Sequence, residues 1–378
     1  MLKPPSHKTE TESQISPKHG GQVYEFARQQ AAPLMESLES VLDFSASINP
    51  ITPQIDWQQL NTAAQLMVPH YPDQQQVELK QAIARRFDLT PEQITLTNGI
   101  SSAILSLFEQ LKPDSTVLFT PIYSEYQRAA QLHSQQVIEV AHNELAHFDS
   151  SNLTEDSVIV LVNPNTPQGA YQSLESLEPL IKAAIEHNCW LFVDESFLPF
   201  ISLATKASVR SLLDLPEANK WIVLQSLTKY YACPGVRIGA LFSAANMLNE
   251  QTEWQWPSWP ISVLDEQFLL QALNDPEHDQ KTLDFLNLVR PQFIEALANC
   301  DLIESVESGL ANFVLVKTTL PALALVQALQ TQNILVRDCQ SFGFGDHTCR
   351  IAIKTSEQNQ QLITALQNLS NALQAESK

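Results

Sequence analysis

The stretch SLTKYYACPGVRIG, residues 226–239, lies between two short apolar runs. The run before it predicts a buried strand, so Lys229 follows just after a strand end. The ε-amine of a lysine attacks an aldehyde only after it loses its proton, and partial burial beside a cation lowers the pKa of that amine. Three neighbours are suited to holding a phosphate, the arginine through a bidentate contact: Ser226, Thr228 and Arg237. The stretch therefore predicts a lysine that reacts with a phosphorylated aldehyde.

The same stretch resembles the S-x-[ST]-K-x-x-x-x-x-G-x-R-x-G signature of fold-type I enzymes that use pyridoxal 5′-phosphate. An isolated lysine is usually a surface residue, but the signature favours a lysine that binds the cofactor. The stretch is similar to the branch of the family that contains histidinol-phosphate aminotransferases and threonine-phosphate decarboxylases. The resemblance covers nearly all of residues 18–355, and it implies that Lys229 is the catalytic residue and the attachment point of the cofactor.

Length and composition predict a globular protein with two domains or more, because the chain has 378 residues. Its net charge of −20 argues against a surface that binds nucleic acid. No apolar run approaches the ~20 residues that a membrane-spanning helix needs. The five cysteines are scattered and form no C-x-x-C pair. This pattern predicts reduced thiols in a cytoplasmic protein and no metal site.

Strand and helix patterns alternate from about residue 95 to residue 242. They predict an α/β fold with a mostly parallel central sheet and helices on both faces. Strands are expected at residues 94–97, 117–120, 158–162, 191–197 and 222–224, and helices at 77–87 and 174–188. In the C-terminal part, strands are expected at 313–316, 334–336 and 350–353 around a helix at 320–330. The resemblance implies the transferase fold type I of pyridoxal-phosphate enzymes.

The chain is expected to divide into four parts. These are a disordered tail at 1–18, an N-terminal arm that covers the substrate at 19–60, a large cofactor-binding domain at 61–270 and a small α/β C-terminal domain at 271–378. The tail is polar and contains prolines, which is typical of disorder. A helical stretch over 278–298 is expected to break near Pro291, close to the domain junction.

A further group of predicted cofactor-binding residues follows strand ends. Ile100 and Ser101 open a helix after a glycine, where free backbone N–H groups form an anion site. Tyr123 comes just past a strand, where its ring can lie on a flat heteroaromatic ligand. Tyr126 is expected to pack inside. Asp194 lies where a carboxylate can meet a pyridine nitrogen and keep it protonated.

Two motifs gain a meaning only from the resemblance. In the family, the tyrosine of a Y-P-[DE] motif reaches the cofactor phosphate of the other subunit, so Tyr71 implies a homodimer with shared sites. The family motif N-P-N-N-P-T-G uses its second paired asparagine to hydrogen-bond the phenolic oxygen of the cofactor. In this sequence that position is Thr166, whose side chain is shorter. Either Thr166 reaches the oxygen through a water molecule, or Asn165 takes the role.

The candidate substrate-binding residues come from both ends of the chain. His19 precedes two glycines, a sequence typical of a plain turn or of a backbone that approaches a ligand closely. With D-F-S-A-S-I-N-P at 43–50, it is similar to the opening of threonine-phosphate decarboxylases, where both segments lie over the substrate. This similarity implies roles for His19, Ser47 and Asn49. The resemblance also implies that Arg350 binds the α-carboxylate and Arg337 the phosphate of the substrate.

The resemblance to threonine-phosphate decarboxylases implies decarboxylation of L-threonine O-3-phosphate to (R)-1-aminopropan-2-yl phosphate in cobalamin biosynthesis. The alternative within the family is a histidinol-phosphate aminotransferase or a related amino-acid aminotransferase, which should lack the H-G-G opening and more often has tyrosine where this chain has Phe197. An alternative of another class is a non-catalytic protein that binds pyridoxal phosphate. Trp254, Trp256 and Trp259 are expected to form a packed crossing between domains, or else to stack on substrate.

Overall fold

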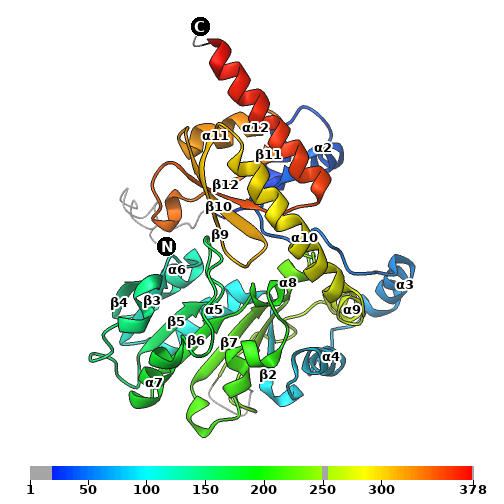
Figure 1. Ribbon diagram of the computed structural model, residues 1–378. Helices are drawn as coiled ribbons and strands as arrows, with labels where there is room; N and C mark the ends of the chain where they lie inside the picture. The colour runs from blue at the N-terminus through cyan, green and yellow to red at the C-terminus, as the bar shows by residue number, and fades with distance from the viewer. Residues whose placement is uncertain (1–18, 249–253, 377–378) are drawn as a thin grey trace, which may run out of the picture.

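The computed structural model describes residues 19–248 and 254–376 (Figure 1). The predicted tail at 1–18 lies outside these residues. The helices are α1 (Val23–Arg28), α2 (Leu34–Ser40), α3 (Trp57–Met67), α4 (Val77–Phe87), α5 (Ile100–Leu111), α6 (Ser124–His133), α7 (Glu178–Glu186), α8 (Leu227–Tyr230), α9 (Val263–Leu273), α10 (His278–Ala298), α11 (Ala322–Gln330) and α12 (Ser356–Glu376). Within the described ranges, no helix is long and apolar enough to cross a membrane.

A seven-stranded sheet forms the lower half of the molecule in Figure 1. Its strands, in spatial order, are β2 (Ile94–Thr97), β8 (Gly239–Phe242), β7 (Trp221–Ser226), β6 (Trp190–Asp194), β5 (Val158–Val162), β3 (Ser115–Thr120) and β4 (Gln136–Ala141). Only β8 runs antiparallel to its neighbours among these strands. The prediction of a mostly parallel α/β sheet is therefore confirmed.

Helices cover both faces of this sheet, as the strand sequences require. Every residue of β5 is buried, which is typical of a parallel strand enclosed on both sides. Alternate residues of β5 point to opposite faces, so Val158 and Val160 join a core with α5 and α6, whereas Ile159 and Leu161 join a core with α4 and α7. This enclosure leaves the ends of the strands as the place where polar side chains can gather.

Strand register brings the predicted site residues to one edge of the sheet. Asp194 pairs with Val162 on β5 and with Leu224 on β7. Ser226, at the end of β7, pairs with Gly239. Strand β6 ends at Asp194 and not near residue 197 as predicted, because the Asp194 carboxylate accepts a hydrogen bond from the Ser196 N–H and turns the chain. The carboxyl ends of β5, β6 and β7 thus meet, which is where open α/β sheets bind ligands.

The upper part of the molecule contains an antiparallel sheet of four strands in the order β12 (Arg337–Asp338), β13 (Thr348–Ala352), β10 (Phe313–Thr318) and β9 (Ile303–Ser308). Beside it, β1 (Leu42–Asp43) from the N-terminal region pairs in parallel with β11 (Ile334–Leu335). The N-terminal arm is therefore joined by backbone hydrogen bonds to the C-terminal part of the chain.

The long helix α10 links the two sheets (Figure 1). It runs without interruption from His278 to Ala298, so the predicted break at Pro291 is wrong. Pro291 lies on the exposed side of the helix, where the carbonyl that lacks its N–H partner can face water. The flanking Val289 and Phe293 are buried and hold the helix together through their packing.

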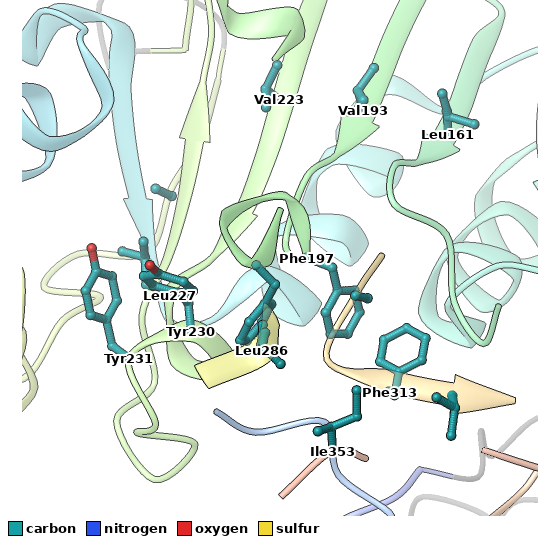
Figure 2. Packing of buried hydrophobic residues seen from close by; sticks show 14 of the residues in the cluster. Leu161, Val193, Phe197, Val223, Leu227, Tyr230, Tyr231, Leu286, Phe313 and Ile353 are labelled. Atoms are coloured by element: carbon teal, nitrogen blue, oxygen red, sulfur yellow. The ribbon is translucent and has the colours of Figure 1, made fainter. Parts of the chain in front are cut away.

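The core that contains α4 and α7 extends from the large sheet into the small one (Figure 2). Val193 and Val223 lie on the large sheet, Phe313 lies on β10, and Phe197 stands between them. The rings of Phe197 and Phe313 meet edge to face, with centroids 5.0 Å apart. Because the core is continuous, the domain boundaries given above remain a prediction.

The tryptophan cluster does not form a crossing between domains. Trp254 and Trp256 stack on each other, with ring centroids 6.1 Å apart, and pack on the α5 side of the large sheet. Trp259 stacks on Tyr71, with ring centroids 4.6 Å apart. None of the three rings lies in the lining of the cavity described below, so no contact of the cluster with substrate is seen within one chain.

Candidate active site

A cavity of about 180 Å³ opens where the carboxyl ends of the large sheet face the small sheet and the N-terminal arm. Predicted site residues from every part of the chain line it: His19, Ser47, Ile100, Tyr123, Thr166, Asp194, Lys229, Arg337 and Arg350. Phe197 and Phe342 add apolar surface. A mostly apolar cavity with a few convergent polar groups is typical of a cofactor site.

Lys229 lies in the short helix α8, directly after β7. Burial lowers the pKa of its amine, Asp194 opposes this shift, and Arg350 and Arg237 add to it. In a larger fraction of the molecules, Lys229 therefore carries the neutral amine that a nucleophile requires. The Lys229 carbonyl accepts a hydrogen bond of 3.0 Å from the Asn49 N–H.

Asn49 does not reach the cavity. Its side-chain amide donates to the Tyr230 carbonyl at 2.9 Å and to Thr282 Oγ1 at 2.8 Å. Asn49 therefore holds the backbone around Lys229, which differs from the predicted contact with substrate.

Asp194 presents a buried carboxylate to the cavity. Its Oδ1 accepts from the Ser196 N–H, and its Oδ2 accepts from the Tyr126 hydroxyl, each at 2.9 Å. Burial and the nearby Asp194 charge raise the pKa of Tyr126 well above its usual value, so Tyr126 remains a donor. Tyr126 packs inside as predicted, but its hydrogen bond to Asp194 was not foreseen.

Tyr123 lines the cavity at the start of α6. Its hydroxyl lies 3.1 Å from Ser101 Oγ in α5, and burial raises its pKa. The ring is thereby held between the large sheet and the helix start, in a place where it can cover one face of a flat ligand.

Most of the predicted phosphate-binding residues lie beside the cavity: Ile100 lines it, whereas Ser101, Ser226, Thr228 and Arg237 do not. The Arg237 guanidinium lies against the start of α5, because a Cβ added at Gly99, whose φ of +72° favours glycine, would lie 2.7 Å from its Nη2. Ser226 Oγ and Thr228 Oγ1 lie 3.1 Å apart at the end of β7. Helix N–H groups, hydroxyls and a guanidinium are the donors that a phosphate prefers.

Arg350 and Arg337 are neighbours across the β12–β13 pair. The Arg350 guanidinium donates to Thr166 Oγ1 at 2.9 Å and to the Ser45 carbonyl at 2.8 Å, and burial lowers its pKa to about 10. Arg337 Nη2 donates to Ser341 Oγ at 2.7 Å, and its guanidinium lies 5.4 Å from the Phe342 ring. Two buried cations at one cavity favour a ligand with anionic groups.

Two buried polar atoms in the cavity lining have no hydrogen-bond partner among the described residues: Arg350 Nε and Ser47 Oγ. Most buried polar groups in proteins are satisfied, so these atoms indicate that a polar ligand completes the site. The site has a partner for each part of pyridoxal 5′-phosphate. Asp194 can meet its ring nitrogen and Tyr123 can cover a face of its ring. Lys229 can react with its aldehyde, and the donors near Arg237 can bind its phosphate.

The alternatives for residues 165 and 166 are separated by their hydrogen bonds. Asn165 Nδ2 donates to Gln168 Oε1 at 3.1 Å, and its Oδ1 accepts from the Ala170 N–H at 2.8 Å. The Asn165 side chain therefore closes its own loop, and Thr166 is the residue that faces the cavity.

Tyr71 lies outside the cavity of its own chain. It is 80% exposed and stacks on Trp259. The structure therefore does not bring Tyr71 together with the other predicted cofactor residues of the same chain.

Sequence reasoning missed several residues around the site. Ser45, Ser196 and Phe342 line the cavity, and Glu125 binds His19, with 2.9 Å between Oε1 and Nε2. Tyr126 and Glu125 both follow Tyr123 within one helical turn, and this spacing was the available signal for them. Ser45 lies in a bend and Phe342 in a three-residue 3₁₀ helix, and both segments are too short for sequence periodicity to give a signal.

Comparisons with known proteins point to one family. The family model described as aminotransferase class I and II matches residues 39–366. A threonine-phosphate decarboxylase of Salmonella typhimurium is 30% identical over 361 residues, covering 93% of this chain and 96% of the relative. The structure of a histidinol-phosphate aminotransferase from Clostridium acetobutylicum has a TM-score of 0.77 at 25% identity and covers 88% of this chain and 100% of that one.

A second histidinol-phosphate aminotransferase, from Sinorhizobium meliloti, was solved in complex with pyridoxal 5′-phosphate. It has a TM-score of 0.78 at 19% identity and covers 98% of this chain and 99% of that one. At this identity the likeness establishes the fold, which is the same over nearly the whole chain.

Proposed function

This chain belongs to the aminotransferase class I and II family and is a pyridoxal 5′-phosphate-dependent enzyme, and we propose that it decarboxylates L-threonine O-3-phosphate. The observation that carries the proposal is the pair of buried arginines, Arg350 and Arg337, with His19 at the same cavity. A substrate with both a carboxylate and a phosphate uses two cationic positions at once. A histidinol-phosphate aminotransferase would use these cations in separate steps, for the carboxylates of glutamate and for the phosphate of histidinol phosphate, so the decarboxylase substrate, which carries both groups, matches this arrangement better. The similarity to the Salmonella typhimurium decarboxylase supports the same choice.

Each residue of the site then has its own role in the reaction. When bound, pyridoxal 5′-phosphate supplies an aldehyde for an amino group and a ring that accepts the electrons of the bond broken at the α-carbon. Asp194 holds a negative charge for the ring nitrogen, and its two hydrogen bonds fix its position. Arg350 binds the carboxylate, and Arg337 with His19 binds the phosphate. How these groups hold the substrate decides whether its carboxylate or its α-hydrogen is lost.

Lys229 handles the proton of the reaction. Burial favours its neutral amine, which can take up a proton at Nζ and deliver it to the α-carbon in place of the departing CO₂. In a transaminase the same amine would remove the α-hydrogen, so the lysine alone does not decide the reaction.

Incubation of the cofactor-loaded protein with L-threonine O-3-phosphate tests the proposal. We expect release of CO₂ and the phosphorylated amino alcohol, both with and without 2-oxoglutarate. Turnover of imidazole-acetol phosphate that depends on glutamate, without CO₂ release, would instead assign the protein as a histidinol-phosphate aminotransferase. Bound cofactor with no turnover in either assay would favour the non-catalytic alternative.

We also propose a homodimer with shared sites. Helix α3 has no buried residue, although it is amphipathic, and Leu66 on it is 70% exposed. Trp57 and Val68, at its two ends, are also largely exposed, as is Tyr71 just beyond. Several large apolar side chains exposed along one short segment are typical of an interface. A second copy seated there would cover this face and could receive Tyr71 at its cofactor phosphate.

A cytoplasmic location is proposed from the five cysteines, which are all free and buried.

Substitution Leu66→Glu tests the interface. A charge at the centre of a buried apolar contact is unfavourable, so we expect the variant to elute as a monomer in size-exclusion chromatography coupled to light scattering. Leu323→Glu is the matched control, because Leu323 on α11 is 61% exposed and lies far along the chain in the small sheet's part of the molecule. A wild-type protein that is already monomeric at micromolar concentration would contradict the proposed dimer.

A further inference from the structure

Glu125 stands behind His19 at the rim of the cavity. It lies in the first turn of α6 and is only 5% exposed. Its Oε1 lies 2.9 Å from His19 Nε2, and its Oε2 lies 3.2 Å from Arg128 Nη1. Glu125 is not part of the cavity lining. Since a buried carboxylate is unfavourable without partners, its role follows from the groups that it holds.

The backbone on the other side of the His19 ring is held by Ser45. The Gly21 N–H donates to Ser45 Oγ at 2.8 Å. A Cβ added at Gly20 would overlap the Ser45 carbonyl oxygen, and that same oxygen accepts from Arg350. The backbone of residues 19–21 is therefore fixed relative to the arginine, and the side-chain torsions of His19 are what remains to be set.

We propose that Glu125 is a positioning residue that orients the His19 ring and thereby increases the affinity of the site for the phosphate of its substrate. This inference rests on the proposed function, in which His19 contacts that phosphate. A carboxylate only accepts hydrogen bonds, so the hydrogen of this pair is on Nε2 of His19. Nδ1 is then left for the phosphate, and because a phosphate oxygen accepts, the ring in the bound state carries a hydrogen on Nδ1 as well.

The position of His19 explains why such an orienting contact is needed. Its side chain is 34% exposed, and its ring centroid lies 5.5 Å from that of Tyr123. An exposed side chain without an anchor samples several rotamers and loses entropy when it binds a ligand. Glu125 belongs to the large sheet's part of the molecule. Its bond to His19 orders the ring before the substrate binds and so removes most of this loss of entropy.

The substitution Glu125→Gln tests the inference in the cofactor-loaded enzyme. Glutamine has the same size, but its amide can donate as well as accept, so it no longer requires the hydrogen on Nε2. We expect the dissociation constant for L-threonine O-3-phosphate, followed by the absorbance change of the bound cofactor, to rise about tenfold, as for the loss of a charged hydrogen bond. The dissociation constant for L-threonine, which lacks the phosphate, should stay within about twofold.

A double-variant cycle separates positioning from a general loss of structure. If Glu125 acts through His19, the variant with both Glu125→Gln and His19→Ala binds the phosphate ester no more weakly than His19→Ala alone. Glu25→Gln is the matched control, since Glu25 on α1 is exposed and lines the adjoining cavity beside His19. Its binding should equal that of the wild type. Glu125→Asp, which withdraws the carboxylate by one methylene, provides a second variant with an expected intermediate effect.

The outcomes distinguish this inference from the proposed function. Unchanged affinity in Glu125→Gln, or additive effects in the double variant, overturns the role of Glu125 while the decarboxylase proposal stands. Weaker binding of histidinol phosphate in Glu125→Gln, with no reaction of threonine phosphate, supports the role of Glu125 and rejects the decarboxylase. Absence of binding of both phosphate esters to the wild type would reject both.

Discussion

The Lys229→Ala variant is expected to lose turnover of any amino-acid substrate by on the order of ten-thousandfold, since it removes both the amine that reacts with the cofactor and a general acid–base group. Lys229 is partly buried, and the lowered pKa of its amine favours the form that reacts. The cofactor should then be held only through non-covalent contacts. We therefore expect the absorbance of bound pyridoxal 5′-phosphate to survive dialysis in the wild type and to be largely lost in the variant.

The control for this experiment is Lys206→Ala, because Lys206 is exposed and lies outside the cavity lining. It should retain both the absorbance and the activity. The far-ultraviolet circular dichroism of Lys229→Ala should match that of the wild type, since loss of the fold would also release the cofactor. An undiminished rate in a correctly folded Lys229→Ala variant would refute the assignment of Lys229 as the catalytic residue.

Elements with strong local signals were predicted well from the sequence. Strand β5 and helix α4 begin and end where the apolar pattern places them. Lys229 and Asp194 were found because each lies at or just past the end of a buried strand, and parallel strands bring their carboxyl ends to one edge. The chemistry at the centre of the site is thus encoded within short segments.

Contacts between distant segments were not predictable in the same way. The pairing of β1 with β11 involves two residues on each strand, which is too short for an alternating pattern to appear. His19 and Glu125 are 106 positions apart, and Tyr126 and Asp194 are 68 apart. Whether such side chains meet depends on how helix α6 packs beside the sheet, and a single sequence carries no periodic signal for that angle.

The two side-chain contacts, His19 with Glu125 and Tyr126 with Asp194, have a common physical property. Each joins a residue near the reacting groups to a buried polar partner that is itself outside the cavity lining, as with Tyr126 behind Asp194 and Glu125 behind His19. Such partners hold a side chain in one orientation before a ligand binds, which lowers the cost of ordering it later. Sequence motifs therefore reveal the residues that bind or react. The residues that orient them become visible only in the folded structure.

The second large effect is expected for Asp194→Asn. Asparagine has nearly the same shape, so the fold and the Ser196 turn should persist, but the negative charge for the ring nitrogen is lost. We expect kcat to fall about a thousandfold, which corresponds to roughly 4 kcal/mol of transition-state stabilisation. The measurement is the steady-state rate with saturating cofactor, so that weaker cofactor binding does not enter the result.

Tyr126→Phe provides the comparison for this variant, because it keeps the carboxylate and removes only the 2.9 Å hydrogen bond to Oδ2. Loss of one hydrogen bond to a charged group is worth about 1.5–3 kcal/mol, so we expect a decrease in kcat of about ten- to a hundredfold, smaller than that of Asp194→Asn. If the two variants lost activity equally, the hydrogen-bonded position of Asp194 would matter as much as its charge. If Asp194→Asn retained a third or more of the wild-type rate, the carboxylate would have no electrostatic role in the reaction, and the arrangement of Tyr126, Ser196 and Asp194 would serve the fold alone.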